Sequence, residues 1–87
     1  MTNYTINGNA MTDRGQAHDE LARALEFPAY YGRNLDALWD LATELAGEVT
    51  LENTAQMLNS LGTYGCQLLE VLYEAAQKNP NLTFLAR

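Results

Sequence analysis

The sequence predicts an α/β fold in which a small three-stranded parallel β-sheet packs with about four helices. Two observations support this prediction. Short β-type segments near the start, the middle and the end of the chain alternate with helical segments, and the apolar residues of the helical segments recur at the spacing of one buried face. Strands joined in this way form right-handed crossovers onto a parallel sheet. Residues 1–87 are expected to form one domain.

The first predicted elements are a strand and a helix. Tyr4 and Ile6 alternate with polar residues, and Asn7-Gly8 ends the segment as a turn. Thr12 or Asp13 caps the helix that follows, and Asp13 with Gln16 forms an Asp-headed relative of the capping box. The buried face of this helix consists of four residues at helical spacing, namely Ala17, Leu21, Ala24 and Leu25.

A second helix is predicted to run from Asn34 to Ala46. Phe27-Pro28 ends the first helix, because the residue before a proline disfavours the α conformation. Asn34 is the N-cap of the second helix and Gly47 the residue just past its end. The remaining elements are a strand at 49–51, a short helix capped by Asn53 or Thr54 and ended by Gly62, a longer helix over 64–78, a break at 79–81 and a strand over 82–85.

The charge of the chain points to a basic partner. The formal net charge of -6 attracts a basic protein and repels nucleic acid and anionic membrane surfaces. No apolar run approaches the roughly 18 to 20 residues that span a bilayer. The chain start lacks the basic and apolar regions of a signal peptide, which predicts a cytoplasmic protein. The single cysteine, Cys66, excludes an intramolecular disulfide and is expected to be a small buried hydrophobe.

Residues 30–40 combine two tyrosines, a glycine, a helix cap and two carboxylates. With about 100° per residue from Asn34, one helix face carries Asp36, Asp40, Thr43 and Glu44. The opposite face is apolar and consists of Leu35, Leu38, Trp39, Leu41, Ala42 and Leu45. Like charges one turn apart destabilise a helix, so a role outside helix stability is expected for this acidic face.

Three other readings of the acidic face are less well supported. Catalytic carboxylates are held across a cleft, whereas Asp36 and Asp40 project from one convex face with no histidine or phosphate-cradling glycine loop nearby. One helix rarely supplies the six or more oxygens that calcium prefers, so weak, incidental metal affinity is the most that is expected. No cofactor is expected either. A plain solvated face is the third reading. An interface is favoured over it because Tyr30, Tyr31 and Trp39 border the face.

The chain also resembles the barstar family of ribonuclease inhibitors. The segment from Tyr4 to Gly8 looks like the family's first strand and turn. The stretch from Phe27 to Asp40 looks like its binding loop and helix, and Val71 to Ala75 looks like part of its last helix. It implies the same three-stranded parallel sheet. It also implies that the helix after the tyrosines plugs a ribonuclease active site, with its carboxylates in the place of RNA phosphates.

The resemblance assigns roles to single residues. Asp40 is expected to be the central phosphate mimic, Asp36 its neighbour, and Tyr30 the aromatic that stacks on the enzyme. Glu74 matches a distant acidic contact, although it also reads as a plain surface glutamate. The complete set expected to bind the partner is Tyr30, Tyr31, Asn34, Leu35, Asp36, Trp39, Asp40, Thr43, Glu44 and Glu74. For Tyr31 and Trp39 packing is the alternative role, and for Trp39 it is the favoured one.

The sequence also departs from the prototype of the family. Arg33 stands where the prototype has an acidic residue, and no glycine-tryptophan pair follows Asp40. The identity of the ribonuclease or toxin domain with a basic cleft therefore stays open. His18, the only histidine, is expected to have a surface or half-buried structural role. The first hypothesis is an inhibitor that is monomeric when free and acts as an immunity protein; the second is an acidic interaction module for a basic partner that is not a nuclease.

Overall fold

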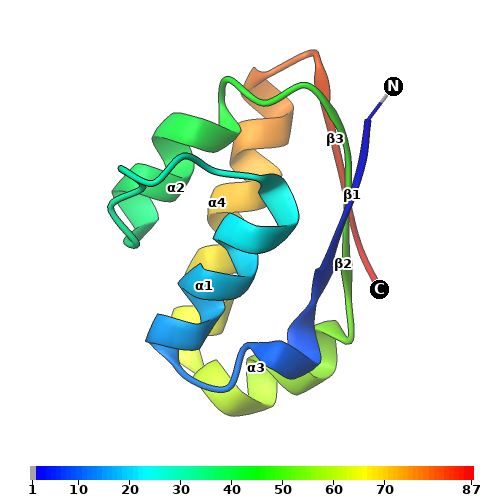
Figure 1. Cartoon of the computed structure of the whole chain (residues 1–87). Coiled ribbons are helices and arrows are strands. Elements are labelled where there is room, and N and C mark those ends of the chain that lie inside the picture. The colour runs from blue at the N-terminus through cyan, green and yellow to red at the C-terminus, as the bar shows by residue number, and fades with distance from the viewer. Residues whose placement is uncertain (1) are drawn as a thin grey trace.

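Three parallel strands form a sheet in the order β1-β2-β3, with β1 at Asn3–Asn7, β2 at Gly47–Glu52 and β3 at Leu82–Ala86. The computed structural model describes residues 2–87. Tyr4 of β1 lies opposite Val49 of β2, which in turn lies opposite Phe84 of β3. Figure 1 shows the helices gathered on one side of this sheet. The predicted three-stranded parallel sheet with helices packed against it is confirmed.

The helices of the described residues are α1 (Arg14–Leu25), α2 (Leu35–Ala42), α3 (Thr54–Leu61) and α4 (Thr63–Lys78). The turn expected at Asn7-Gly8 continues into a short 3-10 helix, η1 (Gly8–Ala10). Two predicted caps are confirmed. Asp13 accepts a hydrogen bond from the Gln16 amide at 2.8 Å, and Asn34 accepts one from the Ala37 amide at 2.8 Å. These bonds fix where α1 and α2 begin.

The two faces of the sheet differ in polarity. Ile6, Val49, Leu51 and Leu82 are buried on the inner face, which packs against the helices. The side chains that alternate with them are exposed on the outer face, which carries Asn3, Thr5, Asn7, Glu48 and Thr83. Parallel sheets usually have both faces covered. Here only one face is covered, so the helices that carry the candidate site lie entirely on the inner side.

Helix α2 ends at Ala42 and not at Ala46 as predicted. Side chains bind carbonyls at and just beyond its end. The Thr43 hydroxyl donates to the carbonyl of Trp39 at 3.0 Å, and the Asn79 amide donates to the carbonyls of Ala42 at 3.2 Å and Leu45 at 2.6 Å. These groups compete with further helical turns for the same carbonyls.

Gly47 does not follow α2 as its terminal glycine but begins β2. Its φ of 139° and the approach of β1, which places the Thr2 carbonyl oxygen 2.5 Å from where a Cβ would stand, both require glycine.

Helices α2 and α4 lie side by side and run in the same direction (Figure 1). Leu35 at the start of α2 and Tyr64 at the start of α4 border one cleft. At the other end, Asn79 directly follows α4 and binds the end of α2. Because α4 is anchored in the core by Leu68 and Leu72, this pairing holds α2 firmly against the body of the protein.

Candidate functional site

The outer face of α2 presents two carboxylates to solvent. Asp36 and Asp40 are exposed one turn apart, while Leu38 and Ala42 on the opposite side are fully buried. Within residues 2–87, neither carboxylate takes part in an ion pair or a side-chain hydrogen bond. Both negative charges are therefore available to a partner and held on a rigid support.

The other predicted residues of this region have different surroundings. Leu35 and Trp39 are half-buried and pack against the core, which agrees with the packing alternative for Trp39. Thr43 is half-buried, and its hydroxyl is occupied by the carbonyls of Trp39 and Asp40. Glu44 is exposed but lies beyond the end of α2. The helical part of the acidic face therefore consists of Asp36 and Asp40, because α2 is shorter than predicted.

A shallow cleft of about 270 Å³ lies between α2 and the loop over residues 27–34, here called the tyrosine loop. Asp40 stands at this cleft together with Tyr30, Tyr31, Gly32, Ala37 and Leu41. The two tyrosines divide their roles: the side chain of Tyr30 is 81% exposed, and that of Tyr31 is 7% exposed. A large exposed aromatic beside an unpaired carboxylate is typical of a protein-binding surface.

Tyr31 is buried because it binds His18. The Tyr31 hydroxyl lies 2.6 Å from Nδ1 of His18, and the Tyr64 hydroxyl lies 2.6 Å from Nε2 of the same ring. His18 is 2% exposed, so the expected surface or half-buried position is wrong. A neutral imidazole donates from one nitrogen and accepts at the other, and the two tyrosines meet both needs. This cluster joins the tyrosine loop to α1 and α4.

The surroundings of this cluster favour its uncharged form. Burial, assisted by the positive charge of Arg33, lowers the pKa of His18 from its ordinary value of 6.5, although Asp19 acts in the opposite direction. Burial likewise raises the pKa of Tyr31 and of Tyr64 above the ordinary value of 10.0. All three groups therefore stay neutral near pH 7.

Arg33 fastens the same loop at a second point. Its guanidinium donates to the Gly15 carbonyl at 2.9 Å and pairs with Asp19 at 2.9 Å, so the residue before the α2 cap is tied to α1. Arg33 has a φ of 53°, which is unfavourable for a residue with a side chain. The contacts with α1 offset that strain. The loop is thus held in one conformation before any partner arrives.

Acid is expected to destabilise the fold through His18. The unfolded chain takes up a proton near pH 6.5, whereas the folded chain takes it up at a lower pH. The free energy of unfolding should therefore fall as the pH drops below 6.5, by up to about 1.4 kcal/mol per pH unit, until the folded-state pKa is passed. Urea unfolding of the native chain and of His18→Gln between pH 7.5 and 5.5 measures this effect.

The glutamine variant should lose that part of the pH dependence, and an unchanged slope in it would contradict the assignment to His18. Glu20 does not confuse the result. The pKa of Glu20 is lowered from its ordinary value of 4.5, chiefly by the hydrogen bond from Arg23. The stability that Glu20 contributes to the fold is therefore fully present above pH 4.5 and is lost only in more acidic solution.

Glu74 is exposed on α4, the helix against which α2 packs. It precedes Asn79 by five residues, or about 7.5 Å along a helix, and Asn79 binds the end of α2. Cys66, on the same helix, is exposed. The expectation of a buried cysteine is wrong, because the inner positions of α4 are taken by Gly65 and Leu68.

The contacts that fix the loop escaped the sequence reasoning. His18 lies 13 residues from Tyr31 and 46 from Tyr64 along the chain, and no local pattern joins them. The capping residue Asn34 was recognisable because its bond to Ala37 spans only one helical turn. Among residues 2–87, no cluster of three metal-binding side chains occurs. No helix in that part of the chain has the length and hydropathy needed to cross a membrane.

The chain is similar to known proteins along nearly its whole length. The family model described as Barstar (barnase inhibitor) matches residues 1–86, nearly the whole chain. A Bacillus subtilis (strain 168) protein named "Putative ribonuclease inhibitor YrdF" is 40% identical over 81 residues, in an alignment that covers 90% of this chain and 89% of the relative. The family match includes the loop over residues 27–34, α2 and α4.

Proposed function

The chain belongs to the barstar family, and on that premise we propose that it inhibits a ribonuclease by plugging the active site of the enzyme. The plug is α2 together with the loop over residues 27–34. The family description and the printed name of the Bacillus subtilis relative both support inhibition of a ribonuclease. The observation that supports the plug itself is Asp40, which is exposed at the edge of a cleft beside Tyr30 and has no ion pair within residues 2–87.

In this proposal Asp40 takes the place of an RNA phosphate. A ribonuclease must hold phosphate with cationic side chains, and a carboxylate makes charge-assisted hydrogen bonds with the same groups. Asp36, one turn earlier on α2, adds a second carboxylate. Tyr30 lays its exposed ring on the enzyme, and an enzyme side chain enters the cleft between Tyr30 and Asp40. Asn34 and Leu35 make flanking contacts at the start of α2.

The remaining predicted residues have supporting roles. Tyr31 and Trp39 hold the loop and α2 in place by packing, since Tyr31 is buried and Trp39 half-buried. Thr43, Glu44 and Glu74 lie around the plug and contact the rim of the enzyme. A loop and helix that are rigid before binding lose little conformational entropy in the complex, which favours tight binding.

Electrostatic interactions make association with the enzyme fast and dissociation from it slow. The net charge of -6 steers the protein toward a positively charged cleft and raises the association rate. Once the carboxylates are desolvated against cationic side chains, dissociation becomes slow. The partner is therefore a ribonuclease, or a toxin domain, with a basic cleft. In the cell that makes such an enzyme, this protein acts as an immunity protein, monomeric when free and without a cofactor.

A titration of RNA cleavage tests the proposal. Barnase and the secreted ribonucleases of the source organism are each mixed with increasing amounts of the purified protein, and cleavage of RNA is followed. One plug fits one cleft, so activity of the bound enzyme should fall to zero near a one-to-one ratio. Undiminished cleavage by all of these enzymes at micromolar protein would overturn the proposal and leave an acidic interaction module for some other basic protein.

A further inference from the structure

We propose that a second, basic cleft beside the plug receives a carboxylate side chain of the same ribonuclease. The inference rests on the proposed function and adds to it a determinant of which ribonuclease is bound. The cleft has a volume of about 470 Å³ and is lined by Arg14, Gly15, His18, Arg33, Asn34, Leu35 and Tyr64. It lies on an otherwise acidic protein, yet two of the five basic residues of the chain border it.

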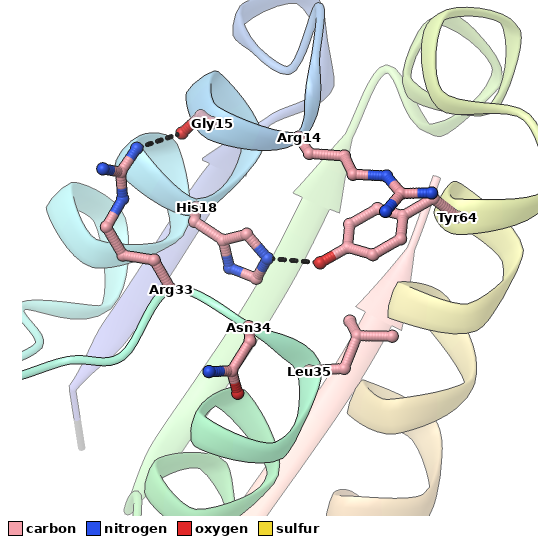
Figure 2. A pocket seen from close by; sticks show the side chains of 7 residues that line it. All are labelled: Arg14, Gly15, His18, Arg33, Asn34, Leu35 and Tyr64. Atoms are coloured by element: carbon pink, nitrogen blue, oxygen red, sulfur yellow. Dashed lines mark hydrogen bonds between the residues drawn. The ribbon is translucent and has the colours of Figure 1, made fainter.

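Arg14 borders this cleft and has no ion-pair partner within residues 2–87. Its guanidinium carbon lies 4.3 Å from the centre of the Tyr64 ring, which orients the group by a cation–π contact (Figure 2). Within residues 2–87, the ion pairs engage Arg23, Arg33 and Arg87 but not Arg14. The guanidinium therefore keeps donors for an incoming acidic group.

The position of Arg14 in its helix is unfavourable in the free protein. Arg14 is the first residue of α1, where the helix dipole disfavours a positive charge. The cation–π contact with Tyr64 acts against that cost. A carboxylate in the cleft would remove the conflict, because it would accept hydrogen bonds from Arg14 and meet the positive end of α1.

The rest of the cleft adds positive potential. Figure 2 shows His18 between Arg33 on one side and Arg14 with Tyr64 on the other. The starts of α1, α2 and α4 all border the cleft, through Arg14, Leu35 and Tyr64. Asp19 pairs with Arg33 and reduces its contribution, so Arg14 is the principal binding group. The pKa of His18 is lowered chiefly by burial and secondly by the positive charge of Arg33, which agrees with a positive environment in the cleft.

The occupant is expected to come from the ribonuclease because the cleft is continuous with the plug. Asn34 and Leu35 border the cleft and also belong to the surface that we propose to contact the enzyme. A ribonuclease that binds α2 with a basic active site could place a single carboxylate from its rim against Arg14, because the two contacts have complementary charges. RNA is a poorer candidate, since a net charge of -6 repels a polyanion. The cleft also acts by exclusion, because an enzyme with a cation at that point would be repelled.

The test compares two variants that remove one positive charge each. Arg14→Ala removes the principal positive charge of the basic cleft. Arg87→Ala removes a positive charge that lies next to β3 and pairs with Glu52. The probe is the ribonuclease that the native protein inhibits most tightly in the titration above. Loss of any positive charge from an acidic inhibitor should strengthen its long-range attraction to a basic enzyme, so Arg87→Ala should bind equally well or slightly better. Arg14→Ala should bind about tenfold or more weakly.

A charge exchange identifies the carboxylate. Each Asp and Glu near the active site of the enzyme is changed to Arg, and one of these variants should bind the native protein poorly but bind Arg14→Glu well. Thermal unfolding of Arg14→Ala and Arg14→Glu verifies that both variants fold.

If the native protein binds but Arg14→Ala binds as well as Arg87→Ala, the inference about the cleft is wrong and the proposed function stands. The inference is also overturned if fluorescein-labelled single-stranded RNA binds the free protein and loses affinity in Arg14→Ala. If no ribonuclease is inhibited at all, the proposed function fails, and the inference fails with it.

Discussion

Replacement of Asp40 by alanine is expected to weaken the complex with the ribonuclease by about 2 to 5 kcal/mol, or roughly 30- to 5000-fold. The change leaves the phosphate-binding cations of the enzyme buried without a partner, and that cost exceeds the attraction of the pair itself. The fold should not suffer. Asp40 is exposed within α2, where it makes no side-chain bond among residues 2–87, and alanine favours helix. Isothermal titration calorimetry measures the change.

Two further variants separate the position of the charge from its presence. Glu48→Ala also removes one negative charge, but Glu48 lies on the outer face of the sheet, away from the helices. Its effect on affinity should be small, and that of Asp36→Ala should lie between the two. Asp40→Asn keeps the shape of the side chain and should lose most of the affinity. Equal losses for Glu48→Ala and Asp40→Ala would show that α2 is not the interface.

Salt is expected to slow association by about tenfold or more between low and high ionic strength, with little change in dissociation. The net charge of -6 acts at long range and is screened over about 8 Å at physiological ionic strength. Electrostatic steering raises association rates by about 10 to 1000-fold, and screening removes that gain. The desolvated contacts that control dissociation are screened far less. Stopped-flow fluorescence from 20 mM to 500 mM salt separates the two rates.

The double variant Asp36→Asn with Asp40→Asn provides a control for this experiment. It retains the rest of the acidic surface but loses the charges nearest to the enzyme, so its association rate should depend less steeply on salt. An association rate of the native protein that stays flat over the whole range would mean that the acidic excess serves only solubility.

The sequence predicted the parts of the fold that depend on local patterns. Alternation around Tyr4 and Ile6 and helical spacing after Asp13 specify elements whose interactions are close in sequence. The Asn34 cap was equally predictable, since its bond closes within one turn. Together these features predicted the three-stranded parallel sheet and the start of α2.

The end of α2 and the rigidity of the loop depend on contacts between distant residues. Asn79 binds the carbonyl of Ala42 from 37 residues away and ends a helix that periodicity alone extended to Ala46. His18 binds Tyr64 from 46 residues away, which buries a histidine expected nearer the surface. No spacing rule relates such pairs, because the fold itself brings them together. The pairing of Arg14 with Tyr64 in the basic cleft has the same origin.

Pre-organisation gives the loop a role beyond its own contacts. Tyr31 points inward to His18 and Arg33 reaches to α1, which leaves Tyr30 directed to solvent beside Asp40. The proposed plug is therefore ordered in the free protein, and its binding to a ribonuclease would require little ordering of the chain. Substitutions at His18 should accordingly affect the stability of the fold and the affinity for the ribonuclease together, although His18 itself is buried.

Competition between the protein and RNA tests the central claim most directly, because a plug and a substrate cannot occupy one active site together. The apparent inhibition constant for the ribonuclease is measured at increasing concentrations of RNA, both below and well above the KM of the enzyme. If Asp40 and Asp36 occupy the phosphate site, the apparent constant should rise in proportion to one plus the ratio of RNA concentration to KM. A constant that is independent of RNA concentration would place the protein elsewhere on the enzyme and would contradict the plug.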